Sequence, residues 1–176
     1  NKEVENINKQ TKQLRDSTLD IIIKLRQEEV ETGHYYIQVI DYLREILNCL
    51  KTISRTSWTH IENNHQGLVK TQSKEMDHIR HEAALIFAEI NQMIEDHNFK
   101  DFDEALGKQK KLLEEIDEFR RKQIKRIKKN RVKTKNSLLY FTLLNESKNL
   151  LLFTINLSKY HKDFVSFVNE TENVHD

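Results

Sequence analysis

The sequence predicts an all-α fold, a long-helix bundle of about five helices, and three observations support this. The 176 residues contain no proline and only three glycines, and these residue types break helices, form hairpin turns and punctuate strands. Apolar residues recur three or four positions apart over long stretches, which is the period of one helix face. Charged residues make up 32 % of the chain and hydrophobic residues 37 %, a balance that suits amphipathic helices.

The first two helices are expected over residues 3–31 and 34–63. The segment Thr32–His34, with Gly33 at its centre, is the expected break between them, and Thr32 can cap the helix that follows. One long kinked helix is the competing interpretation. The polar stretch 63–67 should end the second helix.

Three further helices are expected. Residues 73–97 have the clearest one-sided apolar pattern. The next helix starts near Asp101, which forms a capping-box-like start with Glu104, and it continues to about residue 127. Gly107 lies inside it and should weaken it locally by up to about 1 kcal/mol. Residues 134–169 are apolar around most of the helix circumference, which predicts a place at the centre of the bundle.

A weak internal repeat relates the first two helices to the last two. A shift of 102 residues aligns them without a gap, and the same Val-x-Thr sequence occurs at residues 30–32 and 132–134. Amphipathic helices in register share apolar positions by chance, but the identical turns favour a duplication. Its unit would be three helices, incomplete over residues 1–70 and complete over 71–176, with both units packed as one helical domain.

Composition excludes several classes of protein. The net charge is +1, so no overall field attracts nucleic acid or membrane. The only cysteine, Cys49, cannot form an internal disulfide and is expected as a small buried residue. The longest apolar runs have four residues, far below the roughly 20 needed to span a bilayer. No catalytic spacing of nucleophile, base or paired carboxylates is present, so we do not expect an enzyme.

Metal binding is the alternative suggested by the histidines. Glu-x-x-His pairs can hold a di-iron centre in a four-helix bundle, and His78, His81 and Glu82 share one helix face. The favoured interpretation is nevertheless that these are solvated turn and surface residues, so no metal or cofactor is predicted. The three pairs are Glu31/His34, Glu62/His65 and Glu75/His78.

A basic run is the sharpest local feature. Residues 120–135 contain ten lysines and arginines and no acid, and an acidic block over 114–118 precedes them. The i,i+4 spacing predicts ion pairs from Asp117 to Arg121 and from Glu118 to Lys122, and cations suit a helix C-terminus. A salt-bridged helix end is one interpretation, and contact with anionic lipid or an acidic partner is the other. The candidate contact residues are Arg120, Arg121, Lys122, Lys125, Arg126, Lys128, Lys129 and Arg131.

Nucleic acid is not an expected partner. The basic run contains no aromatic residue on which a base can stack, and no nucleic-acid-binding module surrounds it.

Several segments carry a resemblance to a known family. They are residues 41–53 (DYLREILNCLKTI), 60–65 (HIENNH), 117–127 (DEFRRKQIKRI), 136–141 (NSLLYF) and 146–152 (ESKNLLL). Together they resemble the PhoU-like C-terminal cytoplasmic domain of bacterial sodium/phosphate cotransporters, over nearly the whole chain. The resemblance implies two three-helix units in tandem, with the first helix of the first unit missing here.

The resemblance also implies a function. It implies a non-catalytic cytoplasmic domain that regulates or assembles a sodium-dependent inorganic phosphate transporter. Such a domain is itself soluble and lies on the cytoplasmic side of the inner membrane, after a transmembrane transport core that is its partner. PhoU proteins bind metal clusters through acidic motifs, but the matching positions here are Lys51, Arg55, Lys148 and Leu152. Without carboxylate ligands, no metal site is carried over.

The missing helix predicts an oligomer. It leaves one unit with an unfilled groove, so we expect a homodimer, with helices exchanged between the two copies. Two other functions stay open, a stand-alone PhoU-like regulator of phosphate signalling or uptake, and a metal-binding helical-bundle protein.

Overall fold

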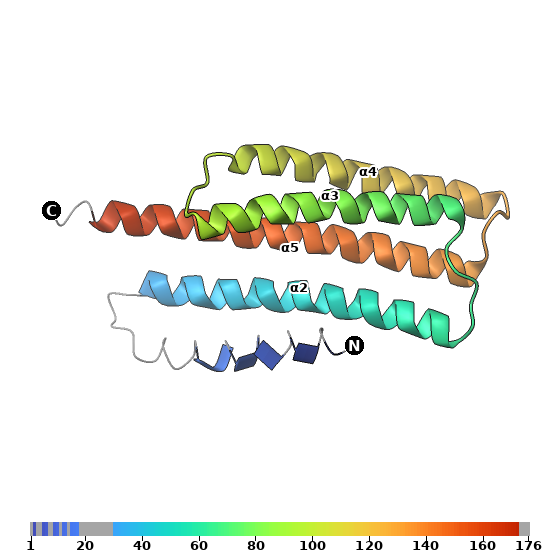
Figure 1. Cartoon of the computed structure of the whole chain (residues 1–176), viewed down its shortest axis with the longest axis horizontal. Helices are drawn as coiled ribbons and strands as arrows, with labels where there is room; N and C mark the ends of the chain where they lie inside the picture. Colours follow the sequence, from blue (N-terminus) through green and yellow to red (C-terminus); the bar gives the residue numbers. More distant parts are fainter. Residues whose placement is uncertain are drawn as a thin grey trace.

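The computed structural model describes residues 30–172 and single positions between residues 2 and 17. All the regular elements in this part of the chain are α-helices, and the described positions between 2 and 17 are helical as well (Figure 1). The expected all-α bundle is confirmed. None of the helices described is long and apolar enough to cross a membrane. The four long helices are α2 (Val30–Glu62), α3 (Lys70–Glu95), α4 (Phe102–Lys128) and α5 (Thr134–Glu172).

Helix α5 lies at the centre of the bundle, as its all-round apolar surface predicts. It packs along α2 on one side and against α3 and α4 on the other, and α3 and α4 also pack against each other (Figure 1). Among the long helices, α2 contacts α5 alone. Helices α3, α4 and α5 therefore form a three-helix unit, to which α2 is attached through α5.

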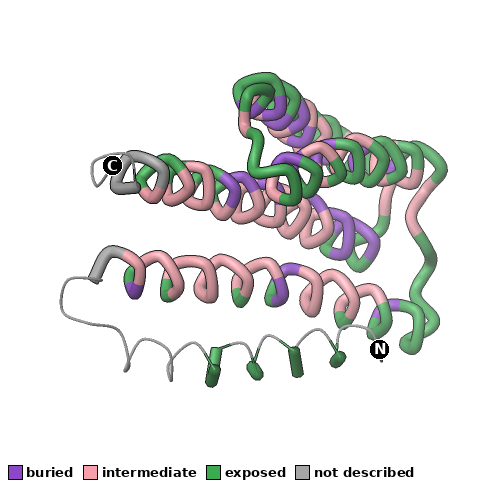
Figure 2. The backbone as a smooth tube through the Cα atoms, turned by 60° about the vertical axis from the view of Figure 1, so that its left-hand side comes forward, coloured by how far each residue is buried: buried purple, intermediate pink, exposed green. Residues whose placement is uncertain are grey.

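The main core lies inside the three-helix unit (Figure 2). Its apolar side chains come from positions three, four or seven apart on each helix, as the sequence pattern predicts. Ile124 and Ile127, which continue the apolar pattern of α4 along the sequence, are 45 % and 40 % exposed. At that end of α4 the fully buried position is occupied by Gln123. The largest fully buried side chains of the core are those of Ile79, Ile90, Leu112, Ile116, Tyr140, Leu144 and Leu151.

The expected break at Thr32–His34 is wrong. Helix α2 begins at Val30 and runs through Gly33. One glycine inside a helix costs only about 1 kcal/mol, and tertiary packing outweighs this cost here because the neighbouring Tyr35 stacks on Phe164 of α5. Residues 18–29 and most of the first expected helix lie outside the described part of the chain.

The start of α4 agrees with the sequence in position and differs in chemistry. Asp101 is the N-cap residue, but its side chain makes no capping hydrogen bond. Its backbone (φ −95°, ψ 14°) is not in the extended conformation that lets an N-cap side chain reach the helix N–H groups. Glu104 instead pairs with Lys108 at 2.9 Å. Gly107 lies inside α4 as expected.

Helices α2, α3 and α4 end in the same way, and without glycine. Each is followed by a residue in the left-handed conformation, at φ angles of 51°, 50° and 52°. The next N–H group bonds the carbonyl five residues back at 3.0 or 3.1 Å, which is the Schellman motif. The polar breaks expected near residues 63–67, 98 and 130–135 are confirmed, and none of the three glycines has a positive φ. The left-handed residues are Asn64, His97 and Asn130.

Candidate functional site

The basic run lies at one end of the bundle, where α4 ends and α5 begins. Helix α3 starts at this same end, because Glu75 near its start pairs with Arg126 near the end of α4. Exposed cations from three helices and a turn therefore share this region. We call these residues the basic end: Lys70, Lys74, Lys125, Lys128, Lys129, Arg131, Lys133 and Lys135.

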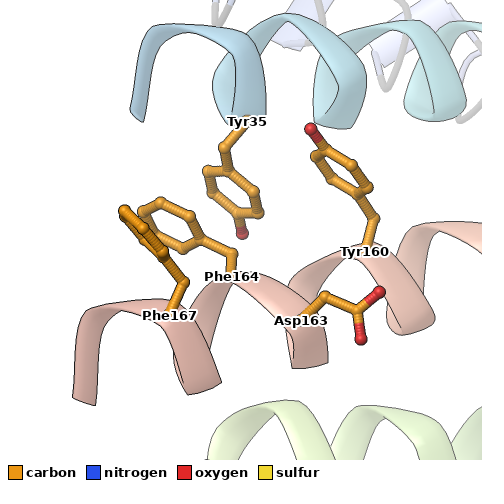
Figure 3. Close-up of a pocket in the computed structure, with 5 residues that line it drawn as sticks. All are labelled: Tyr35, Tyr160, Asp163, Phe164 and Phe167. Carbon is orange, nitrogen blue, oxygen red and sulfur yellow. The ribbon is translucent and has the colours of Figure 1, made fainter. Parts of the chain in front are cut away.

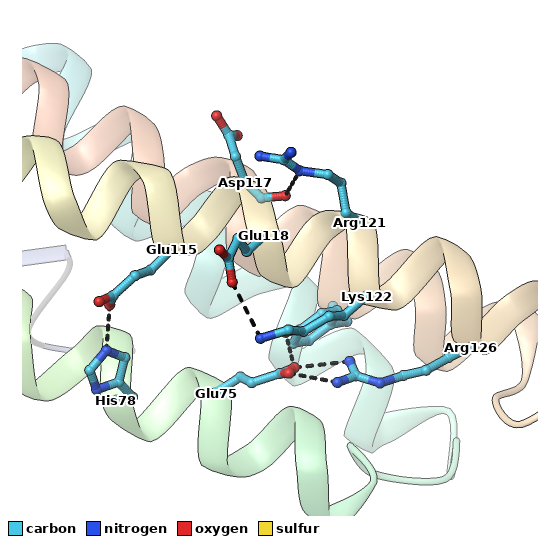
Figure 4. A network of polar contacts seen from close by, with 9 residues as sticks. Glu75, His78, Glu115, Asp117, Glu118, Arg121, Lys122 and Arg126 are labelled. Atoms are coloured by element: carbon cyan, nitrogen blue, oxygen red, sulfur yellow. Dashed lines mark hydrogen bonds and ion pairs between the residues drawn. The ribbon is translucent and has the colours of Figure 1, made fainter.

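Arg126, one of the candidate contact residues, is bound inside the molecule. Its guanidinium donates hydrogen bonds to both carboxylate oxygens of Glu75, at 2.6 and 2.9 Å, and the two side chains are only 16 % and 13 % exposed (Figure 4). The hydroxyl of Tyr140, which is fully buried, also donates to Glu75. The bond to Glu75 raises the pKa of Arg126, and burial raises that of Tyr140. Glu75 is therefore the acceptor for a buried cation and a buried hydroxyl, which corrects its expected place on the surface.

Two fully buried glutamines extend this contact across three helices. Gln123 Oε1 accepts hydrogen bonds from Arg126 (3.2 Å) and from Gln72 Nε2 (3.0 Å). Gln123 Nε2 donates to Ser137 Oγ at 3.0 Å, and Gln72 Oε1 accepts the Val69 N–H at 2.9 Å. The network fixes the start of α3, the end of α4 and the start of α5 against one another. Sequence analysis missed it, although Gln123 is a polar residue seven positions after Ile116 on the apolar stripe of α4.

Arg120 and Arg121 also make contacts within the protein. Arg120 Nη2 donates to Asn145 Oδ1 of α5 at 3.4 Å. Arg121 Nε donates to the backbone carbonyl of Asp117 at 3.3 Å (Figure 4). The expected ion pair between Asp117 and Arg121 is wrong, because the Asp117 carboxylate pairs with Lys148 of α5 at 3.2 Å.

Lys122 forms the other expected ion pair, and the remaining candidates point into solvent. Lys122 Nζ lies 3.5 Å from Glu118 and 5.0 Å from the centre of the Phe119 ring. Four candidates are exposed and form no ion pair with any described residue: Lys125, Lys128, Lys129 and Arg131. The structure therefore separates these four cations, which remain open to a partner, from four that are engaged internally.

The Glu-x-x-His pairs do not come together. Glu75 belongs to the buried ion pair, while His78 Nε2 bonds Glu115 of α4 at 2.6 Å (Figure 4). The side chain of Glu31 lies outside the described part. Within that part, no three histidine, cysteine or acidic side chains are arranged to hold a metal ion.

Cys49 is buried, as expected, and burial raises the pKa of its thiol to about 12. A thiol with this pKa stays protonated near neutral pH and is a poor nucleophile. It packs as a small apolar side chain.

An aromatic cluster joins α2 and α5 at the opposite end of their contact. The ring of Tyr35 stacks on Phe164 at 3.8 Å and on Tyr160 at 5.8 Å between centroids, with Phe167 beside them (Figure 3). The Tyr35 hydroxyl bonds His161 Nδ1. These contacts fix the start of α2 on α5 near the C-terminal end of the described chain.

The fold and the site define an all-helical bundle whose buried polar network holds an exposed basic end. Comparison with models of known families, with curated proteins and with solved structures gives no match for the chain.

Proposed function

We propose that the chain is a non-catalytic, PhoU-like helical interaction domain that regulates or assembles a sodium-dependent phosphate transporter from the cytoplasmic side. The observation that supports this most is the packing of the helices. Helices α3, α4 and α5 form one three-helix unit, and α2 adds to it through α5 alone among the long helices. One complete unit with part of a second is the layout that the resemblance to PhoU-like domains implies.

The pairing of α2 with α5 also supports a tandem arrangement. These are equivalent helices in the 102-residue repeat, and they run antiparallel along each other (Figure 1). Antiparallel packing of equivalent elements is the arrangement produced by a two-fold axis between two units.

The encoded sequence before Asn1 tests the transporter assignment. Several apolar segments of about 20 residues there would support it. An ordinary start codon directly before Asn1 would refute it and would leave the stand-alone PhoU-like regulator.

In cells that make the complete gene product, deletion of residues 1–176 should change how sodium-driven phosphate uptake responds to phosphate supply. An unchanged response contradicts the regulatory role.

The basic end supports contact with anionic lipid headgroups as a second role. Lys125, Lys128, Lys129 and Arg131 are exposed and have no acidic partner among the described residues. Each cation near an anionic membrane surface contributes about 1 kcal/mol, and salt screens this attraction.

Flotation with lipid vesicles tests this role. The chain should float with phosphatidylglycerol vesicles at low salt. It should not float with vesicles of neutral phosphatidylcholine. The variant K125Q/K128Q/K129Q/R131Q should lower the binding at least about tenfold, since four such cations are removed. The control K100Q/K110Q/K111Q/K159Q makes the same charge change at exposed lysines elsewhere and should bind nearly as wild type. Equal loss in both variants contradicts a defined site.

A further inference from the structure

A hollow of about 330 Å³ opens where the end of α2 meets the start of α5, and Leu138 and Leu139 line it together with polar side chains. Arg55 and Thr59 of α2 and His65 of the following turn line one side, and Lys135 and Thr142 of α5 line the other. None of the described side chains around it is acidic. The hollow therefore combines cationic groups with neutral hydrogen-bond donors.

The two cations of the hollow are available to a ligand. Arg55 and Lys135 are both exposed, and neither forms an ion pair with a described residue. They approach from different helices, so a group between them is contacted from two sides. A guanidinium offers several N–H donors in a fixed plane, and a lysine ammonium adds a compact charge.

The histidine side of the hollow is held in place. His60 is buried, and its Nε2–H donates to the carbonyl of Gln66 at 2.8 Å. The ring of His65 lies edge-on to it at 5.1 Å between centroids. The Schellman bonds from Asn64 and His65 also occupy the carbonyls of Ile61 and His60. Two of the carbonyls at the end of α2 therefore already have donors and do not face the hollow as free acceptors.

The start of α5 adds positive potential. The first turn of a helix has N–H groups without helical partners, and its dipole favours acidic residues there. The first turn of α5 contains no acid, and Lys135 lies within it. The positive end of the helix is thus reinforced by a cation, where a carboxylate would ordinarily neutralise it.

We propose that this hollow binds a phosphate group. A tetrahedral anion with several acceptor oxygens can use charged donors from Arg55 and Lys135 together with the hydroxyls of Thr59 and Thr142. A planar carboxylate offers only two oxygens and uses fewer of these donors. The phosphate is either free inorganic phosphate or the headgroup of a lipid. The inference depends on the lining residues alone and does not rest on the transporter assignment.

Titration of the full 176-residue chain with inorganic phosphate, at constant ionic strength, is the first arm of the test. Amide signals from residues 55–65 and 134–142 should shift and saturate at millimolar phosphate, and acetate should shift them less. R55Q/K135Q should weaken binding about tenfold or more, since it removes both charged donors. K100Q/K110Q makes the same charge change at exposed lysines away from the hollow and the basic end and should retain binding. Circular dichroism should give equal helix content for both variants, because all four side chains are exposed.

Vesicles that contain phosphatidic acid are the second arm, with the same two variants. Saturable binding of free phosphate that depends on Arg55 and Lys135 identifies a soluble ligand. If only vesicle binding depends on these two residues, the ligand is a lipid phosphate. The proposal is overturned if neither arm depends on them, or if R55Q/K135Q and K100Q/K110Q lose the same affinity.

Discussion

At the residue scale, the turns of this protein depend on asparagine and histidine in place of glycine. Asn64, His97 and Asn130 adopt positive φ angles. This conformation costs an L-residue roughly 1–2 kcal/mol, and asparagine tolerates it better than most. Some strain is therefore stored at three helix ends, and a residue without a Cβ would release it.

Asn130 gives a direct test of this strain. Asn130→Gly should raise the free energy of unfolding by up to about 1 kcal/mol, and Asn130→Val should lower it by about 1–2 kcal/mol. Urea denaturation measures both. Lys129 has a negative φ of −94°, so Lys129→Gly has no strain to release and should not stabilise. A gain for Lys129→Gly equal to that for Asn130→Gly would contradict the explanation.

His161 predicts a loss of stability in acid. Burial, and to a smaller extent the nearby His97, lower its pKa from the usual 6.5. Its Nδ1 accepts the Tyr35 hydroxyl, and its buried Nε2 has no partner among the described residues. Below about pH 6.5 the unfolded chain therefore takes up this proton before the folded chain does, so the free energy of unfolding falls as the pH falls.

Denaturation curves between pH 5 and pH 8 measure this dependence. Wild type should lose stability from neutral pH to about pH 5, and His161→Gln should lose less over the same range. The exposed His81 provides the matched control His81→Gln. Identical pH slopes for wild type and His161→Gln would rule out this residue as the source.

At the element scale, one buried glutamine connects three helices. Gln123 bonds Gln72 of α3 and Ser137 of α5, so Gln123→Leu leaves the buried Nε2 of Gln72 without an acceptor. We expect it to lower the free energy of unfolding by about 2–3 kcal/mol. The double variant Q72L/Q123L should cost less than the sum of the two single variants, because Gln123→Leu alone leaves Gln72 Nε2 without its acceptor and the double variant removes that donor. Additive losses in urea denaturation would contradict a coupled network.

Periodicity predicted the helices well because each one has its own apolar stripe. It failed at Gly33, because the packing of α2 on α5 is a tertiary effect that local sequence does not contain. The sequence showed the run of basic residues over 120–135. It did not show which of these cations bond other residues of the protein and which are exposed without an ion pair. Arg126 and Gln123 find their partners 51 residues earlier in the chain, and no local pattern indicates such a pairing. Glu118 and Lys122 were predictable because they are one helical turn apart.

At the scale of the whole molecule, the most exposed large apolar side chains among the described residues lie on α2. Trp58 and Ile61 are 66 % and 67 % exposed and lie one helical turn apart, and Ile37 is 44 % exposed. Neighbouring exposed apolar side chains of this size mark interaction surfaces. Tryptophan in particular dominates the energy of many protein interfaces.

We expect this surface of α2 to support the homodimer that the incomplete first unit predicts. Sedimentation of the wild-type chain should give a dimer at micromolar concentrations, and W58A/I61A should shift it towards the monomer. L85A/I124A removes two exposed apolar side chains from α3 and α4 and should leave the dimer intact. A monomer at every concentration would contradict the dimer prediction. A dimer unaffected by W58A/I61A would move the interface away from α2, towards the exchange of helices between the two copies.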